Sequence, residues 1–544
     1  MSSLLPLEIF EEIFENLHDD KITLHSCILV NRSWCITAIP ILWRRPFVLL
    51  NKPSVKLIHT YIANVFDQLE SEVRLTKYIK ILSRPFFKYS MYLKDLRTKI
   101  LTQSIKDWVN GMECQFESEL EGSFFDFNEV ELVCHLYSLL IKSFISVQNI
   151  IHCSLENFQS LRGHHIEYSP KYPKFLRSLQ IEIKYDNHIL SYLTRINCVT
   201  LEEIWIGPLS SGVQLDSLSQ LIKIQNSLKD FRLYGPRCEW LGVPIEIISA
   251  LSNQYKTLHT IRFSECNFSF YNLFDYLGIC QNLKNLEFHN CDFPEDQATS
   301  WCNVTFPNLE ILSFVGVVYL DVEKVTTIVK NSQKNLSKVF LPCMTPQEDL
   351  TMFTEILMNC KNVTCFAFWA NTDAELDAAF RALESFNSLE CLSIDSEDGL
   401  ILNSNQLSQL GKILTPTLRH LEICVDTSAE SFEQFLLNLK ADLESLTLSW
   451  CPNISDDHIK VIIGYAKRNS KLKYVALDND RSTNLSDVVI NETFKVIPYF
   501  RIESIDSCEV IRAWFDDSIY LLNSSSKIVE EFYEISLIFE RKVF

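Results

Sequence analysis

The segments LHTIRF (residues 258–263) and LKNLEF (residues 283–288) share one pattern, with apolar residues at the first, fourth and sixth positions. The same pattern begins at twelve places in the chain, spaced 25 to 30 residues apart: Leu176, Leu201, Leu228, Leu258, Leu283, Leu309, Leu336, Val363, Leu389, Leu418, Leu443 and Leu472. Weaker candidates lie near Val147 and Tyr499. A single match would mean little in a sequence that is 47% hydrophobic, but so regular a spacing indicates a structural repeat.

Each repeat is predicted to contain one short strand and one helix. Strand side chains alternate between two faces, so the fourth and sixth residues of the pattern point together into a core. A helix is expected after each strand, as in residues 455–464, where Ser455 would cap a helix whose Ile459, Ile462 and Ile463 share one face. One such unit cannot bury its apolar face alone, whereas stacked units bury a continuous core. The sequence therefore predicts an α/β solenoid.

Cysteine follows the pattern in several repeats, three residues after the last apolar position: Cys266, Cys291 and Cys451. We expect these small side chains to point inward and to meet buried backbone carbonyls, because a thiol is a weak hydrogen-bond donor. Repeats of this kind resemble the leucine-rich repeat family, in its longer cysteine-containing variety, over residues 147–500. The resemblance implies a horseshoe whose strands line a concave surface.

The strand residues between the buried positions would face this concave surface and are candidates for binding a protein substrate. Counting from each motif predicts these outward-pointing residues: Trp205, Arg232, Tyr234, Arg262, Glu287, His289, Phe340, Trp369, Asp395, Glu422 and Tyr474. Exposed aromatic and arginine side chains are typical of binding hot spots. The alternative is that the aromatic members pack on neighbouring strands or under loops.

The N-terminal segment, residues 4–45, is organised differently. Leu5-Pro6 opens a helix, because proline is favoured at a first helical position, and Ile9, Ile13 and Leu17 then form an apolar stripe. A second apolar segment and a third short helix follow, up to residue 43. Three short helices cannot bury all of these large side chains among themselves, so the surplus apolar surface requires a partner.

This segment resembles an F-box. The matching positions are Leu5, Pro6, Glu8, Ile9, Ile13, Leu17, Leu24, Cys27, Val30, Arg32, Trp34, Leu42 and Trp43. The resemblance implies docking on the Skp-type adaptor of a cullin-based SCF ubiquitin ligase, with the repeats holding the protein substrate. The adaptor-binding residues that it implies are Leu5, Pro6, Glu8, Ile9, Ile13, Leu17, Leu24, Val30, Trp34 and Trp43. For the two tryptophans, contact with the adaptor and internal packing remain alternatives.

The expected organisation is a small three-helix F-box followed by a leucine-rich-repeat horseshoe. Its parts are an F-box over residues 1–47, a helical connector with degenerate first repeats over 48–145, leucine-rich repeats over 146–500 and a C-terminal cap over 501–544. Helices are predicted in the connector over residues 55–69 and 129–144, on either side of a polar, acidic stretch. The alternative function is a ubiquitin-independent scaffold or sensor whose N-terminal helices only cap the solenoid.

The composition argues against several classes of function. Fifty basic and 69 acidic residues leave a formal charge of −19, which disfavours nucleic acid and anionic membranes as partners. Glycine contributes only 12 of 544 residues, and a phosphate-binding loop requires clustered glycines. The N-terminus lacks the basic start of a signal peptide, so we expect a cytoplasmic or nuclear protein whose 18 cysteines are reduced.

Motifs for metal binding and catalysis are also missing from the sequence. No C-x-x-C pair occurs, and the densest ligand-like cluster, His164-His165 with Glu167, is typical of a surface loop. No G-x-S-x-G, H-E-x-x-H or G-x-G-x-x-G motif occurs. We therefore expect no metal and no cofactor, and a receptor subunit whose enzyme complex supplies the chemistry.

Overall fold

The computed structural model describes residues 7–50, 52–65, 85–116, 129–146, 152–155, 176–181, 188–207, 215–235, 242–268, 273–293, 304–317, 322–332, 334–341, 358–370, 372–395, 402–425, 427–449, 453–478 and 485–503. These residues belong to two compact units, one up to Leu228 and one from Lys229 onward.

The first unit begins with three short helices, α1 (Leu7–Glu15), α2 (Lys21–Ile28) and α3 (Arg32–Leu42). Its other helices are α4 (Pro46–Leu50), α5 (Val55–Asn64), the 3-10 turn η2 (Tyr89–Met91), α8 (Thr98–Phe116), α9 (Glu129–Ser146), α10 (His188–Arg195) and α11 (Asp216–Lys223). Its strands are β1 (Asp95–Arg97), β2 (His152–Leu155), β3 (Ser178–Ile181) and β4 (Glu203–Ile206), which pair in parallel in chain order.

Side-chain caps set where the second and third helices begin. The Asp20 carboxylate accepts a hydrogen bond from the backbone N–H of Thr23 at 3.0 Å, and the Asn31 amide oxygen accepts one from Trp34 N–H at 2.9 Å. Each bond satisfies one of the donors that the first turn of a helix leaves free. Each cap thus supports the start of a helix that is too short to be stable alone.

The second unit repeats strand and helix along its length. Its strands are β5 (Asp230–Tyr234), β6 (Thr260–Ser264), β7 (Asn285–His289), β8 (Ile311–Val315), β9 (Lys338–Leu341), β10 (Cys365–Trp369), β11 (Cys391–Asp395), β12 (His420–Ile423), β13 (Ser445–Leu448), β14 (Tyr474–Asp478) and β15 (Tyr499–Glu503). Its helices are α12 (Ile245–Ser252), α13 (Phe274–Leu277), α14 (Val322–Ser332), α16 (Asp373–Leu383), α17 (Ser404–Ile413), α18 (Ala429–Asn438), α19 (Asp456–Arg468) and α20 (Asp487–Val496).

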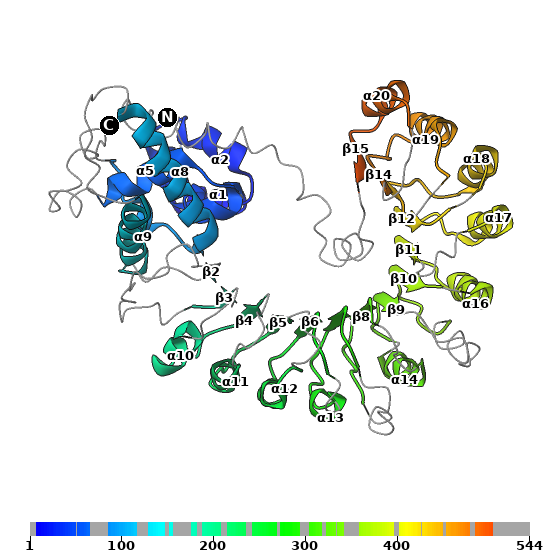
Figure 1. Cartoon of the computed structure of the whole chain (residues 1–544), viewed down its shortest axis with the longest axis horizontal. Coiled ribbons are helices and arrows are strands. Elements are labelled where there is room, and N and C mark those ends of the chain that lie inside the picture. Colours follow the sequence, from blue (N-terminus) through cyan, green and yellow to red (C-terminus); the bar gives the residue numbers. More distant parts are fainter. Residues whose placement is uncertain are drawn as a thin grey trace. The chain divides into compact units, whose positions relative to one another are not determined.

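These eleven strands pair in parallel and in chain order, and they lie on the inner side of an arc whose outer side is formed by the helices (Figure 1). The arrangement confirms the predicted α/β solenoid. The fourth and sixth residues of the motif are buried as expected: Ile261, Phe263 and Phe288 are 0% exposed. Rings of successive repeats stack, with the centroids of Phe263 and Phe288 5.8 Å apart and those of Phe288 and Phe314 5.4 Å apart. Each repeat thus completes the core of its neighbour.

The turn after the strand is built around the expected cysteines. The Cys266 thiol donates to the carbonyl of Leu233, 3.6 Å away in the preceding repeat, and Cys291 donates to Phe263 O at 3.5 Å. Burial raises the pKa of Cys266 well above its ordinary value, so the thiol remains a donor. Both thiols satisfy buried carbonyls, as the sequence predicts, whereas Cys451 lies outside the described residues.

Asparagine side chains form a second link between repeats. In four successive repeats the residue before the first apolar position donates its amide to a backbone carbonyl of the preceding repeat. These bonds join Asn282 to Lys256 O (2.8 Å), Asn308 to Gln281 O (3.0 Å), Asn335 to Pro307 O (2.6 Å) and Asn362 to Lys334 O (2.8 Å). Each amide therefore fastens the turn that leads into a strand to the same turn one repeat earlier.

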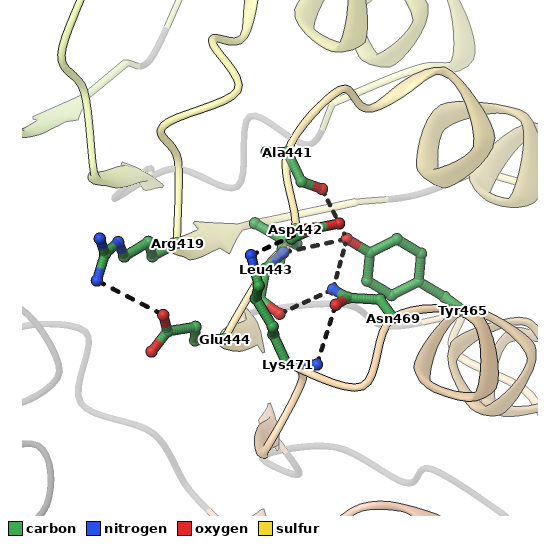
Figure 2. A network of polar contacts seen from close by, with 8 residues as sticks. All are labelled: Arg419, Ala441, Asp442, Leu443, Glu444, Tyr465, Asn469 and Lys471. Atoms are coloured by element: carbon green, nitrogen blue, oxygen red, sulfur yellow. Dashed lines mark hydrogen bonds and ion pairs between the residues drawn. The ribbon is translucent and has the colours of Figure 1, made fainter.

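A buried version of this link holds β13 to α19 (Figure 2). The Tyr465 hydroxyl donates to Ala441 O at 3.0 Å and accepts from the backbone N–H of Leu443 at 3.2 Å. The Asn469 amide donates to Leu443 O at 2.9 Å and to the Tyr465 hydroxyl at 3.2 Å. Its oxygen accepts from Lys471 N–H at 3.0 Å. Helix α19 and its C-cap residue Asn469 thus supply two donors and one acceptor to the turn that leads into β13.

The edges of the repeat region differ from the predicted pattern in detail. The weak candidate near Tyr499 is β15, whereas the candidate near Val147 is displaced, since β2 begins at His152. Strand β1 has no recognisable motif in the sequence, and the helices expected in the connector are α5 and α9. Of residues 501–544, only 501–503 are described. None of the helices in the described ranges is long and apolar enough to cross a membrane.

Candidate functional site

The first candidate surface is apolar and lies on the three N-terminal helices. Six large apolar side chains between residues 7 and 42 are exposed: Ile9, Ile13, Ile22, Leu29, Val30 and Ile36. They are one third of the eighteen such side chains among the described residues, although this segment has only 36 residues. Such a concentration of exposed apolar side chains is typical of a segment that contacts another molecule. We call these six residues the helical patch.

An aromatic cluster and one ion pair position the first helix. The Trp34 ring centroid lies 5.3 Å from that of Phe10 and 5.4 Å from that of Phe14, so α1 packs on α3. The Arg44 guanidinium donates to both carboxylate oxygens of Glu15 at 2.6 Å. This hydrogen bonding holds the pKa of Glu15 below its ordinary value and raises that of Arg44. With α1 fixed in this way, Ile9 and Ile13 point to solvent.

The residues expected at the adaptor divide into four groups. Glu8, Ile9, Ile13 and Val30 are exposed, and Leu17 and Trp34 are half-buried. Leu24 and Trp43 are 0% exposed, so in this structure they form core and not surface. Leu5 and Pro6 lie outside the described residues.

The burial of Trp43 decides between the two alternatives for that residue. Its ring centroid is 3.9 Å from that of Tyr89 and 5.5 Å from that of Tyr61 on α5. Trp43 therefore joins the N-terminal helices to the connector. Leu24 lies on α2, which packs closely against α3, and it is completely buried.

Three members of the helical patch, Ile22, Leu29 and Ile36, were not predicted from the sequence. The sequence does contain a signal for two of them. Ile22 and Leu29 are seven residues apart, and they follow Asp20, which caps the start of α2. Residues at this spacing lie on one face of a helix. Because the buried Leu24 and Ile28 occupy the opposite face, the face with Ile22 and Leu29 had to be the outer one.

The second candidate surface is the inner face of the strands. Strand pairing in register places one residue of each repeat in a row across this face, and the central row of the second unit runs Arg232, Arg262, Glu287, Ser313, Phe340, Ala367, Ser393, Glu422, Thr447, Ala476 and Arg501. Tyr474 lies in the row before it, and Tyr234, His289, Trp369 and Asp395 lie in the row after it. Every residue predicted for this unit thus lies in one of these rows.

Exposure on this inner face is lower than expected. Arg232, Arg262, Tyr234 and Tyr474 are partly exposed, and in the first unit Trp205 on β4 is 44% exposed. By contrast, Glu287, His289, Phe340 and Glu422 are buried, which corrects the prediction that they point into solvent. The side chains of Trp369 and Asp395 lie outside the described residues.

Contacts along the row explain most of this burial. Arg262 pairs with Glu287 at 2.8 Å, and His289 lies 3.5 Å from the same carboxylate. Further along, the Ser393 hydroxyl donates to Glu422 at 2.9 Å. Neighbouring strands are about 4.8 Å apart and an inward curve brings their side chains closer still, so these polar groups shield one another. The rows therefore present a charged, self-paired surface, and Phe340, which lies between Ser313 and Ala367, is not an exposed anchor.

The two candidate surfaces in the described part of the chain offer apolar contact and charge. No group of three or more His, Cys, Asp or Glu side chains in these ranges is arranged to hold a metal ion. The Arg232 guanidinium is held by Asp230 on the same strand at 2.9 Å, which keeps its position fixed on the inner face. Both surfaces are suited to binding proteins by apolar contact and by charge.

Comparison with known proteins identifies the N-terminal part. No curated protein matches the sequence, and the solved structures that resemble its fold include the following two. A chain of the crystal structure of the Rad7 and Elc1 complex in yeast is 13% identical with a TM-score of 0.39, covering 72% of this chain and 90% of that one. The leucine-rich repeat-containing protein LegL7 from Legionella pneumophila is 13% identical with a TM-score of 0.34, covering 58% and 97%. Such distant likenesses carry no functional argument. The family model described as F-box-like matches residues 2–49, so the three N-terminal helices belong to an F-box-like domain.

Proposed function

We propose that this chain is the substrate-binding subunit of an SCF-type ubiquitin ligase. Its F-box-like domain would dock on a Skp-type adaptor and through it on a cullin, and its repeats would bind the protein substrate. The observation that carries the proposal is the helical patch on an F-box-like domain. The subunit would have no catalytic activity of its own and would act in the cytoplasm or nucleus.

The helical patch offers enough apolar surface for docking. Ile9, Ile13 and Val30 are 40%, 44% and 56% exposed, so complete burial against a partner would contribute roughly 1 kcal/mol for each side chain. Placing a carboxylate at such a position removes this contribution and adds the cost of desolvating a charge. Paired substitutions in α1 should therefore abolish binding to the adaptor.

The test is affinity purification with mass spectrometry of the full-length chain. We expect Ile9→Glu with Ile13→Glu, and separately Leu5→Ala with Pro6→Ala, to lose the adaptor. The matched control is Val55→Glu, because Val55 on α5 is 42% exposed and lies outside the F-box-like domain. Adaptor peptides that persist in the Ile9/Ile13 variant, or that are absent from the wild type, would refute the assignment.

Substrate binding is assigned to the inner face of the repeats. The accessible candidates are Trp205, Arg232, Tyr234, Arg262 and Tyr474, which combine aromatic and guanidinium groups. We expect alanine at Trp205, Tyr234 and Tyr474 together to leave the adaptor bound and to remove co-purifying substrate proteins. Recovery of the cullin, together with slower turnover of a captured protein in this variant, supports ligase function. Adaptor binding without cullin recruitment would indicate a scaffold instead.

A further inference from the structure

Two cysteines lie side by side on the inner face of the second unit. Cys365 on β10 and Cys391 on β11 are partners in the parallel register of these strands. Both point away from the core, because Phe366 and Leu392, the next residues, are buried core positions of their motifs. Each cysteine keeps 6% of its surface exposed.

Their separation suits a covalent link. Paired strands place Cα atoms about 4.8 Å apart, within the roughly 4.4–6.8 Å that a disulfide requires. Because the strands line the inner side of the arc, side chains on this face converge (Figure 1). Both thiols are free in this structure.

The two sulfur atoms differ in acidity. The hydrogen bond from Cys391 lowers the pKa of Cys365, and the ammonium of Lys338, which is the register partner of Cys365 on β9, acts in the same direction. The same hydrogen bond, together with burial, raises the pKa of Cys391. One sulfur is thus favoured as a thiolate and the other as a proton donor, which is the division of roles that a reactive thiol pair needs.

We propose that Cys365 and Cys391 form a redox site that reacts with hydroperoxides and closes into a disulfide between β10 and β11. The Cys365 thiolate attacks one oxygen of hydrogen peroxide, the O–O bond breaks, and the departing hydroxide takes up a proton to become water. This leaves a sulfenic acid on Cys365. The Cys391 sulfur then attacks the Cys365 sulfur, the S–S bond forms, and the S–O bond breaks. The hydroxyl leaves with the Cys391 proton as a second water, so two thiols and one peroxide give one disulfide and two waters.

The chain contains a matched pair that should not react. Cys266 and Cys291 occupy equivalent positions in successive repeats, three residues after the last apolar position of each motif. Both are almost completely buried, and each donates to backbone carbonyls of its surroundings. Burial raises the pKa of Cys266 well above its ordinary value, so this thiol stays protonated and unreactive. This pair is an internal control for the oxidation of adjacent thiols in general.

The test is peptide mapping of the full-length protein after exposure to excess hydrogen peroxide, with free thiols blocked before digestion. Trypsin releases residues 362–381 and residues 382–412, and each peptide contains one cysteine, Cys365 and Cys391 respectively. We expect a cross-linked peptide pair that disappears on reduction, while Cys266 and Cys291 remain as free thiols. Absence of this cross-link in folded protein would overturn the proposal. Equal oxidation of the Cys266/Cys291 pair would also overturn it.

Two substitutions at Cys391 test the assigned roles. Cys391→Ser keeps a hydrogen-bond donor but cannot form the disulfide, so we expect a sulfenic acid on Cys365 that dimedone traps. Cys391→Ala removes the donor and should slow this trapping. Circular dichroism checks that both variants fold. If Cys365 reacts at the same rate in the serine and alanine variants, Cys391 does not activate it and the proposed division of roles is wrong.

Discussion

Replacing Tyr465 by phenylalanine removes one oxygen atom from the network that joins β13 to α19, and its effect can be worked out from the structure. The hydroxyl accepts from Leu443 N–H and donates to Ala441 O, and the side chain is only 6% exposed. Burial raises the pKa of the phenol, so the donor proton is present at neutral pH. In Tyr465→Phe the Leu443 amide would be a buried donor without this acceptor.

The expected cost is about 2 kcal/mol, since leaving a buried polar group unsatisfied costs roughly 1–3 kcal/mol. A change of this size corresponds to a roughly thirtyfold increase in the population of locally opened molecules. Unfolding of a repeat protein is not a single two-state transition, so the measurement must be local. Hydrogen exchange with mass spectrometry, on peptides covering residues 441–449, reports the opening of this turn directly.

The matched control is Tyr255→Phe, because Tyr255 is 42% exposed and its loss of a hydroxyl should change stability by less than about 0.5 kcal/mol. Exchange over residues 441–449 in Tyr465→Phe that is indistinguishable from wild type would refute the reasoning. Asn469→Ala should accelerate exchange in the same peptides. The double variant should cost less than the sum of the two, because both side chains serve Leu443.

Three further predictions concern the first helix, a tight turn and helix α19. Hydrogen bonding to Arg44 lowers the pKa of Glu15 in the folded protein. This contact therefore stabilises α1 above the ordinary carboxylate pKa, and the stabilisation is lost as the pH falls through the lowered value. Glu15→Gln should remove this pH dependence from the hydrogen exchange of α1. Gly316 has φ +63° and an added Cβ would overlap the Asn290 amide, so Gly316→Ala should cost roughly 1–3 kcal/mol. Gly464→Ala, inside α19, should instead stabilise by about 0.4–1 kcal/mol. Hydrogen exchange of peptides around each position measures both effects locally.

The strands were predictable because their signal is repeated. Each motif marks two core positions two residues apart, and twelve such marks at similar spacing fix both the strand positions and their register. Strand β1 could not be found in this way, since its three residues contain one buried apolar side chain, Leu96, and no repeat spacing. The F-box-like segment was recognisable for a related reason, because ordered identities extend over forty residues.

Exposure on the inner face could not be predicted in the same way. The repeated apolar pattern predicts that Glu287, Phe340 and Glu422 point away from the core, and the register of the paired strands confirms this direction. Pointing away from a core does not ensure contact with water, because neighbouring strands bring further side chains against them. Glu287 is held by Arg262 and Glu422 by Ser393, contacts between residues about 25 to 29 positions apart that the local pattern does not contain.

The amide links between repeats all point the same way. Asn282, Asn308, Asn335, Asn362 and Asn469 each reach back to a carbonyl of the preceding repeat. A ribosome makes the carbonyl first and its amide about 26 to 28 residues later. The carbonyl of each turn in this series therefore gains its amide hydrogen bond only after the following repeat has been synthesised. During synthesis, the newest repeat of the solenoid always lacks this bond.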